Sequence, residues 1–296
     1  MPPRERFERI DGILRVAAPA KINLDLYVGP RRADGYHPVD SVVAKVTLYD
    51  DLLLRGRLDG EITLRVDGAD GGPVEQNLAL RAARRLAEET DTPFGADIHL
   101  TKAIPPGRGL GGGSSDAAAS LAGLARLWRV ELPAGRLAEL AAELGSDVPL
   151  FLGTPTARIT GRGERLQPVA VHPFVAVLHL PDITCSTPEV YRRFDDLPPS
   201  GHVADDRDLR TMGRRPPSRW RRGLRNDLTA AACADDDEFR RLFEQLTDCV
   251  GEDLAVTGSG SALFVLCDDE DEAAEMMRRL PDGLPGRTVL VSGSVS

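Results

Sequence analysis

The sequence has few cysteines, no long apolar run and no excess of positive charge, and each shortage excludes a class of protein. Its four cysteines lie far apart without a CxxC pair, which argues against a zinc ribbon or a disulfide framework and predicts a reducing, cytoplasmic location. No stretch approaches the roughly 20 apolar residues of a membrane span, and the first residues carry no apolar signal core, so we expect no association with a membrane. Acidic residues outnumber basic ones by 46 to 37, which leaves no broad basic face for nucleic acid.

Lysine is also scarce in a chain that is otherwise ordinary in composition. Its 296 residues are 42% apolar and 28% charged, which suits one large globular domain or two ordinary ones. Of the 37 basic residues 34 are arginine, and the lysines are Lys21, Lys45 and Lys102. Because a compact, titratable ammonium differs chemically from a guanidinium fork, each lysine is a candidate for a role that arginine does not suit. The alternative for each is a chance choice.

Hydrophobic spacing predicts an α+β protein. Near-alternating aliphatic residues favour strands at 13–18, 22–28, 41–48 and 61–66, and apolar residues at helical spacing favour a helix at 77–89. Further predicted elements are strands at 96–103, 174–180, 254–256 and 262–266, a hairpin of 157–160 with 166–171, and helices at 114–127, 137–144, 237–246 and 270–280. The polar stretch 195–222 is interpreted as a mobile excursion. We expect two α+β domains, residues 1–165 and 166–296.

The strongest signal is a glycine-rich loop between a predicted strand and a predicted helix. The run 105–118 reads PPGRGLGGGSSDAA, and five of the seven residues from 107 to 113 are glycine. Glycine loses much backbone entropy on folding, so close approach or unusual dihedral angles must justify the run. Ser114, Ser115 and Asp116 are suited to capping the helix that follows. Free amides at a helix start favour an anion, which predicts a phosphate-binding loop; a flexible linker is the alternative.

Three known kinds of nucleotide-binding loop fit the context poorly. Gly107, Gly109 and Gly112 formally satisfy GxGxxG, but Pro105 and Pro106 intervene after the strand, and no second strand ending in an acid follows about 20 residues later. A Walker loop requires Gly-Lys-Ser/Thr, which is missing here. The His-Arg-Asp and Asp-Phe-Gly signatures of protein kinases are also missing.

The loop resembles the ATP-binding motif of the GHMP kinases, the superfamily of galactokinase, homoserine kinase, mevalonate kinase and phosphomevalonate kinase. Two further segments share the resemblance, APAKINL at 18–24 with RADGYH at 32–37, and VTGSGSA at 256–262. GSDVP at 145–149 matches the acid-bearing segment of the family, and all segments follow the family's order. The Gly-Gly-Gly-Ser-Ser run is most similar to the branch that acts on a cytidine diphosphate-linked methylerythritol. The stretch 195–222 does not align, and Arg108 fills a position where the family often has glycine.

The resemblance implies a fold and an activity. The fold is the two-domain GHMP kinase fold, with an ATP-binding N-terminal domain like domain 2 of ribosomal protein S5 and a ferredoxin-like C-terminal domain. The activity is transfer of the γ-phosphoryl group of ATP, accompanied by Mg²⁺, to the 2-hydroxyl of the cytidine diphosphate-linked methylerythritol, in non-mevalonate isoprenoid synthesis. The sequence names no magnesium ligand. We expect a monomer or weak homodimer with a small-molecule substrate.

The resemblance also assigns catalytic roles to Lys21 and Asp147. A carboxylate can accept the proton of the attacking hydroxyl, and a nearby ammonium can keep that carboxylate ionised and contact the phosphoryl oxygens. Asp147 follows Gly145 and Ser146 and precedes Val148 and Pro149, so the alternative for it is an N-cap. The alternative for Lys21 is a solvated strand residue. Lys102 has no comparable support, although it could lie near the phosphates.

The remaining expected site residues contact the two ligands. The ATP-binding residues are Pro105, Pro106, Gly107, Arg108, Gly109, Leu110, Gly111, Gly112, Gly113, Ser114 and Ser115. In the family, residues matching Tyr36 and His37 receive the cytosine ring by stacking and hydrogen bonding, and Tyr191 aligns with a second stacking aromatic. Asn23 lies two residues from Lys21, so both point to one face of a strand and Asn23 could bond the erythritol moiety. Gly258 belongs to an expected second backbone approach, for which a hairpin turn is the alternative.

Two rival functions differ in kind. Another GHMP kinase, such as homoserine or mevalonate kinase, would be favoured by absence of the Tyr36-His37 pair. A GHMP-fold sensor or binding module without catalysis would be favoured by loss of Lys21 or Asp147, and both are present.

Overall fold

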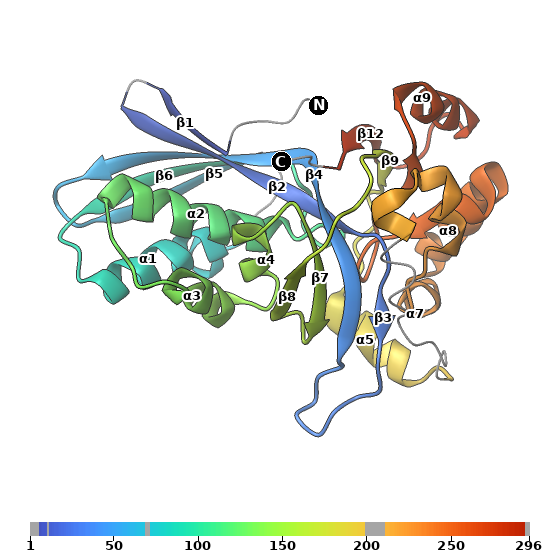
Figure 1. Cartoon of the computed structure of the whole chain (residues 1–296), viewed down its shortest axis with the longest axis horizontal. Coiled ribbons are helices and arrows are strands. Elements are labelled where there is room, and N and C mark those ends of the chain that lie inside the picture. The colour runs from blue at the N-terminus through green and yellow to red at the C-terminus, as the bar shows by residue number, and fades with distance from the viewer. Residues whose placement is uncertain (1–5, 11, 69–71, 199–210, 294–296) are drawn as a thin grey trace.

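The computed structural model describes residues 6–10, 12–68, 72–198 and 211–293. These residues form two β-sheets, each with its own helices, which lie side by side along the long axis of the molecule (Figure 1). The fold is the expected two-domain α+β arrangement.

The first sheet has eight strands within the described residues, and its long strand β4 connects most of them. The main path runs β1 (Phe7–Ile10), β2 (Ile13–Asn23), β4 (Val39–Arg57), β6 (Gly95–Lys102) and β5 (Ile62–Gly68). β3 (Tyr27–Val28) and β7 (Thr156–Gly161) also pair with β4, and β8 (Arg165–Pro168) pairs with β7. β5 and β6 are parallel, while the other pairs are antiparallel.

Helices gather on one side of this sheet (Figure 1). They are α1 (Leu78–Thr90), α2 (Gly112–Trp128), α3 (Arg136–Leu144) and α4 (Val148–Leu152). Asn77 caps α1, because its Oδ1 accepts the amide of Ala79 at 2.9 Å. Leu86 of α1 and Leu121 of α2 are fully buried with Leu52 and Leu54 of β4 in one hydrophobic core. This core fixes the start of α2, and therefore the glycine loop, against the sheet.

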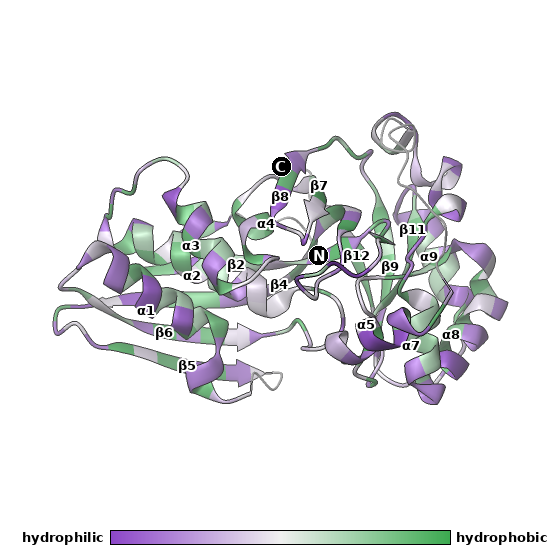
Figure 2. Cartoon of the chain, turned by 90° about the horizontal axis from the view of Figure 1, so that it is seen from below, coloured by the Kyte–Doolittle hydropathy of each residue, from purple (hydrophilic) through white to green (hydrophobic). Residues whose placement is uncertain are grey.

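The second sheet has the ferredoxin-like order. Its strands lie as β12 (Arg287–Ser292), β9 (Val175–Leu180), β11 (Leu263–Cys267) and β10 (Leu254–Val256), all antiparallel. Its helices are α5 (Thr187–Asp195), α7 (Thr229–Asp235), α8 (Asp237–Val250) and α9 (Glu270–Arg279). Hydrophobic residues concentrate on the strands and on the inner sides of these helices, while the outer sides of α8 and α9 are largely hydrophilic (Figure 2).

A second hydrophobic core joins the two sheets. It packs Ile22 and Val46 of the first sheet against Phe264 and Leu178 of the second, together with Leu110 of the glycine loop. The expected boundary between residues 165 and 166 falls inside β8, which pairs with β7 in the first sheet through Pro168. The pairing therefore favours a division after Pro168 and before β9.

Most predicted elements correspond to observed ones, and the structure adds several that the pattern missed. The additions are β1, α4, α5, α7 and β12. Part of the predicted excursion at 195–222 lies outside the described residues. In its described part the expectation of a mobile segment is wrong, because two 3₁₀ turns, Pro217–Arg219 and Arg221–Gly223, are anchored by buried Arg221, which pairs with Asp253 at 3.0 Å and Glu272 at 2.7 Å.

None of the helices in the described ranges is long and apolar enough to cross a membrane.

Candidate active site between the domains

A cavity of about 400 Å³ lies where the two domains meet, and segments far apart in the sequence form it. The glycine loop supplies one wall from Pro105 to Ser114, and Lys21 and Asn23 of β2 supply another. Asp147 and Gly258 also line it. The structure thus brings together residues from the segments 18–24, 105–118, 145–149 and 256–262, while the segment 32–37 does not line this cavity. Ser115 is buried in α2 and does not form part of this lining.

The glycine loop leaves the start of α2 uncapped. Gly111 occupies the N-cap position with φ of 68°, and no side chain caps the helix, so the expectation that Ser114, Ser115 or Asp116 would do so is wrong. The amide of Ser115 donates to the carbonyl of Gly111 at 2.9 Å, which leaves the amides of residues 112–114 without an intrahelical acceptor. Gly112, Gly113 and Ser114 line the cavity, so these amides and the helix dipole form a site suited to an anion.

The loop contacts the C-terminal domain closely at Gly109. A Cβ atom at this position would lie 2.1 Å from the carbonyl oxygen of Thr257, so only glycine fits. The hydroxyl of Thr257 lies 3.3 Å from the carbonyl of Gly109 and accepts the backbone amide of Asn23 at 3.0 Å. Arg108 adds a second tie, because its Nε donates to the carbonyl of Pro181 at 2.7 Å. The two domains therefore hold the loop between them.

Lys21 is buried at the bottom of this cavity. Its Nζ donates to Oδ1 of Asn23 at 2.5 Å, and Nδ2 of Asn23 donates to Oγ of Ser41 at 2.8 Å. Burial lowers the pKa of Lys21, and the negative charge of Asp147 acts in the opposite direction. The interpretation of Lys21 as a solvated strand residue is excluded by its 6% exposure.

Asp147 lies at the start of α4 but does not cap it. It occupies the N-cap position of Val148–Leu152 without a side-chain capping hydrogen bond. The charge of Asp147 affects the pKa of both Lys21 and Tyr191. Burial, and to a smaller extent the Asp147 carboxylate, raises the pKa of Tyr191 to about 12. A carboxylate that is not used as a cap, and that is close to a buried ammonium inside a cavity, is suited to accept a proton.

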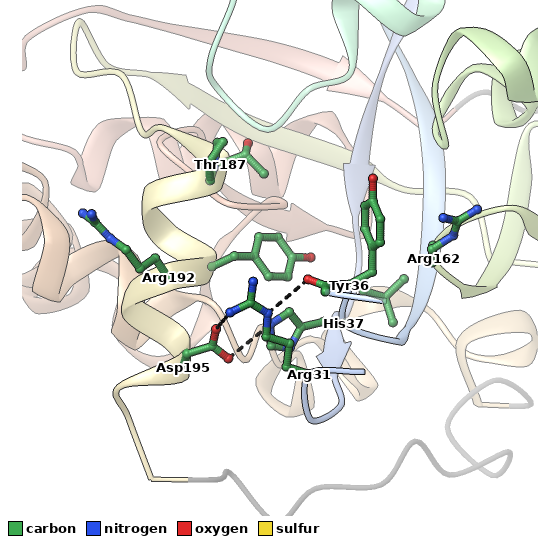
Figure 3. A pocket seen from close by; sticks show the side chains of 11 residues that line it. Arg31, Tyr36, His37, Arg162, Thr187, Arg192 and Asp195 are labelled. Atoms are coloured by element: carbon green, nitrogen blue, oxygen red, sulfur yellow. Dashed lines mark hydrogen bonds and ion pairs between the residues drawn. The ribbon is translucent and has the colours of Figure 1, made fainter. Parts of the chain in front are cut away.

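A second cavity of about 590 Å³ opens beside the first and has an aromatic wall (Figure 3). Tyr36, His37 and Tyr191 line it. The rings of His37 and Tyr191 lie 5.4 Å apart between centroids, and Tyr36 is 55% exposed. Such faces can stack on a flat heteroaromatic ring.

Protein partners hold both ring nitrogens of His37. Nδ1 contacts the carbonyl of Gly29 at 2.9 Å, and Nε2 lies 3.2 Å from the carboxylate of Asp195 at the end of α5. Asp195 also forms an ion pair with Arg31, with 3.5 Å between Nη1 of Arg31 and Oδ2 of Asp195 (Figure 3). Asp195 therefore ties the loop that carries Tyr36 and His37 to the helix that carries Tyr191.

The two cavities adjoin each other. Val39, Arg162, Thr187 and Tyr191 line both of them. An elongated ligand can therefore reach from the aromatic wall to Lys21 and Asp147.

Beneath the glycine loop lies a buried charge cluster that the sequence did not reveal. Lys102 of β6 pairs with Asp50 of β4 and, at 2.7 Å, with Asp116 of α2. Burial raises the pKa of Asp116, and Lys102 opposes that shift. For Lys102, burial disfavours the ammonium, but the carboxylates of Asp116 and Asp50 together raise its pKa. Lys102 thus packs against the glycine loop: a Cβ atom added to Gly112 would lie 3.2 Å from Nζ of Lys102.

Several other site residues were also missed from the sequence: Thr257, Arg162 and Asp195. Thr257 lies inside a matched segment, and that was its only available signal. Arg162 and Asp195 contact the site from β7–β8 and α5, in regions whose position depends on tertiary structure. Cysteine plays no part in the cavities, and all four cysteines are free.

Comparison with known proteins agrees with this geometry. The model of the GHMP kinase N-terminal domain matches residues 77–153, and that of the GHMP kinase C-terminal domain matches residues 218–286. The fold is therefore that of a GHMP kinase. A homoserine kinase structure from Cytophaga hutchinsonii shares the fold with a TM-score of 0.70 at 16% identity, covering 99% of this chain and 98% of its own.

Other relatives are much more similar in sequence. The 4-diphosphocytidyl-2-C-methyl-D-erythritol kinase of Chromobacterium violaceum is 40% identical over 91% of both chains, and that of Nitrosospira multiformis is 38% identical over 92% of this chain and 89% of its own. A crystal structure of 4-(cytidine 5'-diphospho)-2C-methyl-D-erythritol kinase has a TM-score of 0.76 and 35% identity, covering 95% of this chain and 100% of its own. The chain belongs to the 4-diphosphocytidyl-2-C-methyl-D-erythritol kinase family.

Proposed function

We propose that this protein transfers the γ-phosphoryl group of ATP to the 2-hydroxyl of 4-diphosphocytidyl-2-C-methyl-D-erythritol, a step of non-mevalonate isoprenoid synthesis. The observation that supports this most directly is that the two cavities adjoin and share four lining residues. One has aromatic walls suited to a base, and the other combines an anion-binding loop with Lys21 and Asp147. A nucleotide-linked alcohol has the length to occupy both.

In the proposed reaction Asp147 accepts the proton of the 2-hydroxyl as its oxygen attacks the γ-phosphorus. The bond from that phosphorus to the β–γ bridging oxygen breaks, and ADP leaves with the bridging oxygen. Lys21 contacts the phosphoryl oxygens and stabilises the charge of the transferring group, while Asn23 orients Lys21 through the 2.5 Å hydrogen bond. The amides at the start of α2 receive the nucleotide phosphates. Positioning and charge stabilisation supply most of the catalysis in reactions of this kind.

ATP and Mg²⁺ complete the proposal. Within the described ranges no three His, Cys, Asp or Glu side chains form a cluster that could hold a metal ion, so the residues present do not make a dedicated magnesium site. Mg²⁺ is commonly held by substrate phosphates with few protein ligands, and we assign it to the nucleotide without naming a residue. We further propose a cytoplasmic monomer or weak homodimer, in line with four free cysteines.

A coupled assay of ADP release tests the proposal against its rivals. The cytidylylated methylerythritol, homoserine and mevalonate are compared at equal concentration. We expect turnover with the first only. Preference for homoserine or mevalonate would reject the substrate, and ATP binding without turnover on any of the three would favour a sensor without catalysis.

Gly111→Val is expected to weaken the binding of ATP. A Cβ atom at Gly111 would lie 2.9 Å from Cζ of Phe151 and 3.2 Å from Cγ of Lys21, and its φ of 68° disfavours a branched residue. Strain of roughly 1–3 kcal/mol corresponds to an increase of about 5- to 150-fold in the ATP dissociation constant. Calorimetry measures ATP and the cytidyl ligand separately, and binding of the cytidyl ligand should stay measurable.

Gly135→Val is the control for strain alone. Gly135 also has positive φ, of 84°, but a Cβ atom there would contact nothing within 4 Å. It should lower stability without changing ATP affinity. Equal loss of both ligands in Gly111→Val would indicate a folding defect, and unchanged ATP affinity would reject the loop as the phosphate site.

His37→Ala is expected to weaken binding of the substrate and to leave binding of the nucleotide unaffected. The substitution removes the ring that holds the loop to Asp195 and lies against Tyr191. Loss of a polar contact and an aromatic neighbour together suggests a rise of about 5- to 150-fold in the substrate KM. Steady-state kinetics with each substrate varied in turn measures both constants.

His172→Ala is the matched control, because His172 lines neither of these cavities. It should leave both constants within experimental error. A change in the ATP constant alone for His37→Ala would contradict the placement of the base at Tyr36 and His37.

A further inference from the structure

Arg162 lies where the two cavities meet. It occupies the turn between β7 and β8, and of the four residues that line both cavities it is the one with a charged side chain. The turn is well defined, because the backbone amide of Arg162 donates to Oε2 of Glu164 at 2.5 Å. The next residue, Gly163, approaches Asp147: a Cβ atom on it would lie 3.6 Å from Oδ1 of that carboxylate. The turn therefore connects the aromatic wall with Asp147, the candidate catalytic base.

The other arginines of the aromatic cavity have carboxylate partners. Arg31 pairs with Asp195 at 3.5 Å, and Arg192 pairs with Glu189. Among the described residues, the guanidinium of Arg162 makes no ion pair with a carboxylate; it lies over the ring of Tyr36, with Cζ 4.9 Å from the centroid (Figure 3). The charge of Arg162 acts on the Glu164 carboxylate of the same turn, but because the two form no ion pair the guanidinium remains able to bind an anionic ligand.

We propose that Arg162 binds the diphosphate of the substrate. In this way it determines the preference of the protein for a nucleoside diphosphate-linked alcohol. The proposal rests on the proposed function, in which the base lies against the aromatic wall and the reacting hydroxyl lies near Asp147. A diphosphate between these two groups must pass the section that both cavities share. A guanidinium presents parallel N–H groups that match phosphate oxygens, and its fixed position over Tyr36 reduces the entropy lost on binding.

Calorimetry with CDP and cytidine isolates the diphosphate contribution. The wild-type protein, Arg162→Gln and Arg162→Lys are titrated with each ligand at one ionic strength. For Arg162→Gln we expect affinity for CDP to fall about 10- to 100-fold and affinity for cytidine to change less than about 2-fold. Arg162→Lys keeps the charge and should recover part of the loss. With the full substrate, KM should rise while the ATP constant stays fixed.

Arg193→Gln is the matched control, since Arg193 also lies on α5 and makes an exposed ion pair, with Asp196 at 3.8 Å, but lines neither cavity. It should change both affinities less than about 3-fold, as expected for an exposed ion pair. An equal loss of CDP and cytidine in Arg162→Gln would show that Arg162 acts only through Tyr36, and would overturn the proposal. If neither affinity changes in Arg162→Gln, the proposal is overturned as well, while the proposed function stays intact. Wild-type protein that binds neither ligand would reject the cytidyl substrate and Arg162 together.

Discussion

Asp147→Asn is expected to lower kcat about 100-fold or more and to leave both substrate constants nearly unchanged. Asparagine keeps the size of the side chain and its ability to hydrogen-bond, but it cannot accept the proton of the attacking hydroxyl. The structure makes this test clean, because the side chain of Asp147 does not cap α4 and its replacement therefore removes no capping hydrogen bond. Steady-state kinetics and thermal denaturation of the same preparations separate catalysis from stability.

The pH dependence of the remaining activity gives a second measurement on the same variant. Burial lowers the pKa of Lys21, and the charge of Asp147 partly offsets this. Neutralising residue 147 removes the offsetting charge, so the ammonium of Lys21 should lose its proton at lower pH than in the wild-type protein. The alkaline limb of the rate profile should therefore shift to lower pH in Asp147→Asn.

Asp182→Asn is the control, because Asp182 is exposed and lines neither cavity. It should keep wild-type turnover. Near-normal turnover in Asp147→Asn would reject Asp147 as the base. A reduced rate with an unshifted alkaline limb would instead reject the electrostatic coupling of Lys21 to Asp147.

Local patterns in the sequence were enough to place the elements that carry the loop. The strand before it, the helix after it and the paired strand β2 all have regular apolar spacing, which is set by neighbours in the sequence. The elements that were missed are short or depend on tertiary contacts. α4 has five residues, and β12 obtains its place from pairing with β9, more than a hundred residues earlier in the chain.

The site divides in the same way. Residues inside compact motifs, such as Lys21 and Gly109, could be proposed from the sequence. Thr257 and Asp195 could not, because their roles arise from contacts with Asn23 and His37, which are more than 150 residues away in the chain. The capping prediction at 114–116 failed for a related reason. Gly111 already ends the loop in a left-handed conformation, so the helix begins before the serines and they lie within its first turn.

The buried cluster under the loop shows how a lysine without a motif can be essential. Lys102→Met is expected to lower the free energy of unfolding by roughly 3–5 kcal/mol, the usual cost of removing one partner from a buried ion pair. Asp50 has no exposed surface and Asp116 is 2% exposed, so both carboxylates would remain buried without their cation. Backbone amides of Ala103 and Ile104 still bond Asp50, at 2.6 and 2.8 Å, which leaves Asp116 as the main source of the loss. Urea denaturation at pH 7 measures it.

The destabilisation caused by Lys102→Met should depend on pH, because Asp116 titrates. Burial raises the pKa of Asp116 in the folded state above its ordinary value of 3.8, so between these two pKa values the folded state binds a proton that the unfolded state releases. Because the native state then binds more protons, stability falls as pH rises between these values. Without the opposing charge of Lys102 the pKa of Asp116 should rise further. The stability difference between Lys102→Met and the wild-type protein should therefore be smaller at pH 5 than at pH 8.

Lys45→Met separates the loss of an ion pair from the loss of a buried ammonium. Lys45 is also buried, and burial lowers its pKa to about 8, but its Nζ donates to the carbonyls of Gly153 and Phe151. Its removal leaves no buried carboxylate without a cation, so the cost should stay near 1 kcal/mol, as for ordinary hydrogen bonds. Equal destabilisation by the two substitutions would show that the carboxylates do not need Lys102. A difference that did not shrink at low pH would show that Asp116 is not the group left uncompensated.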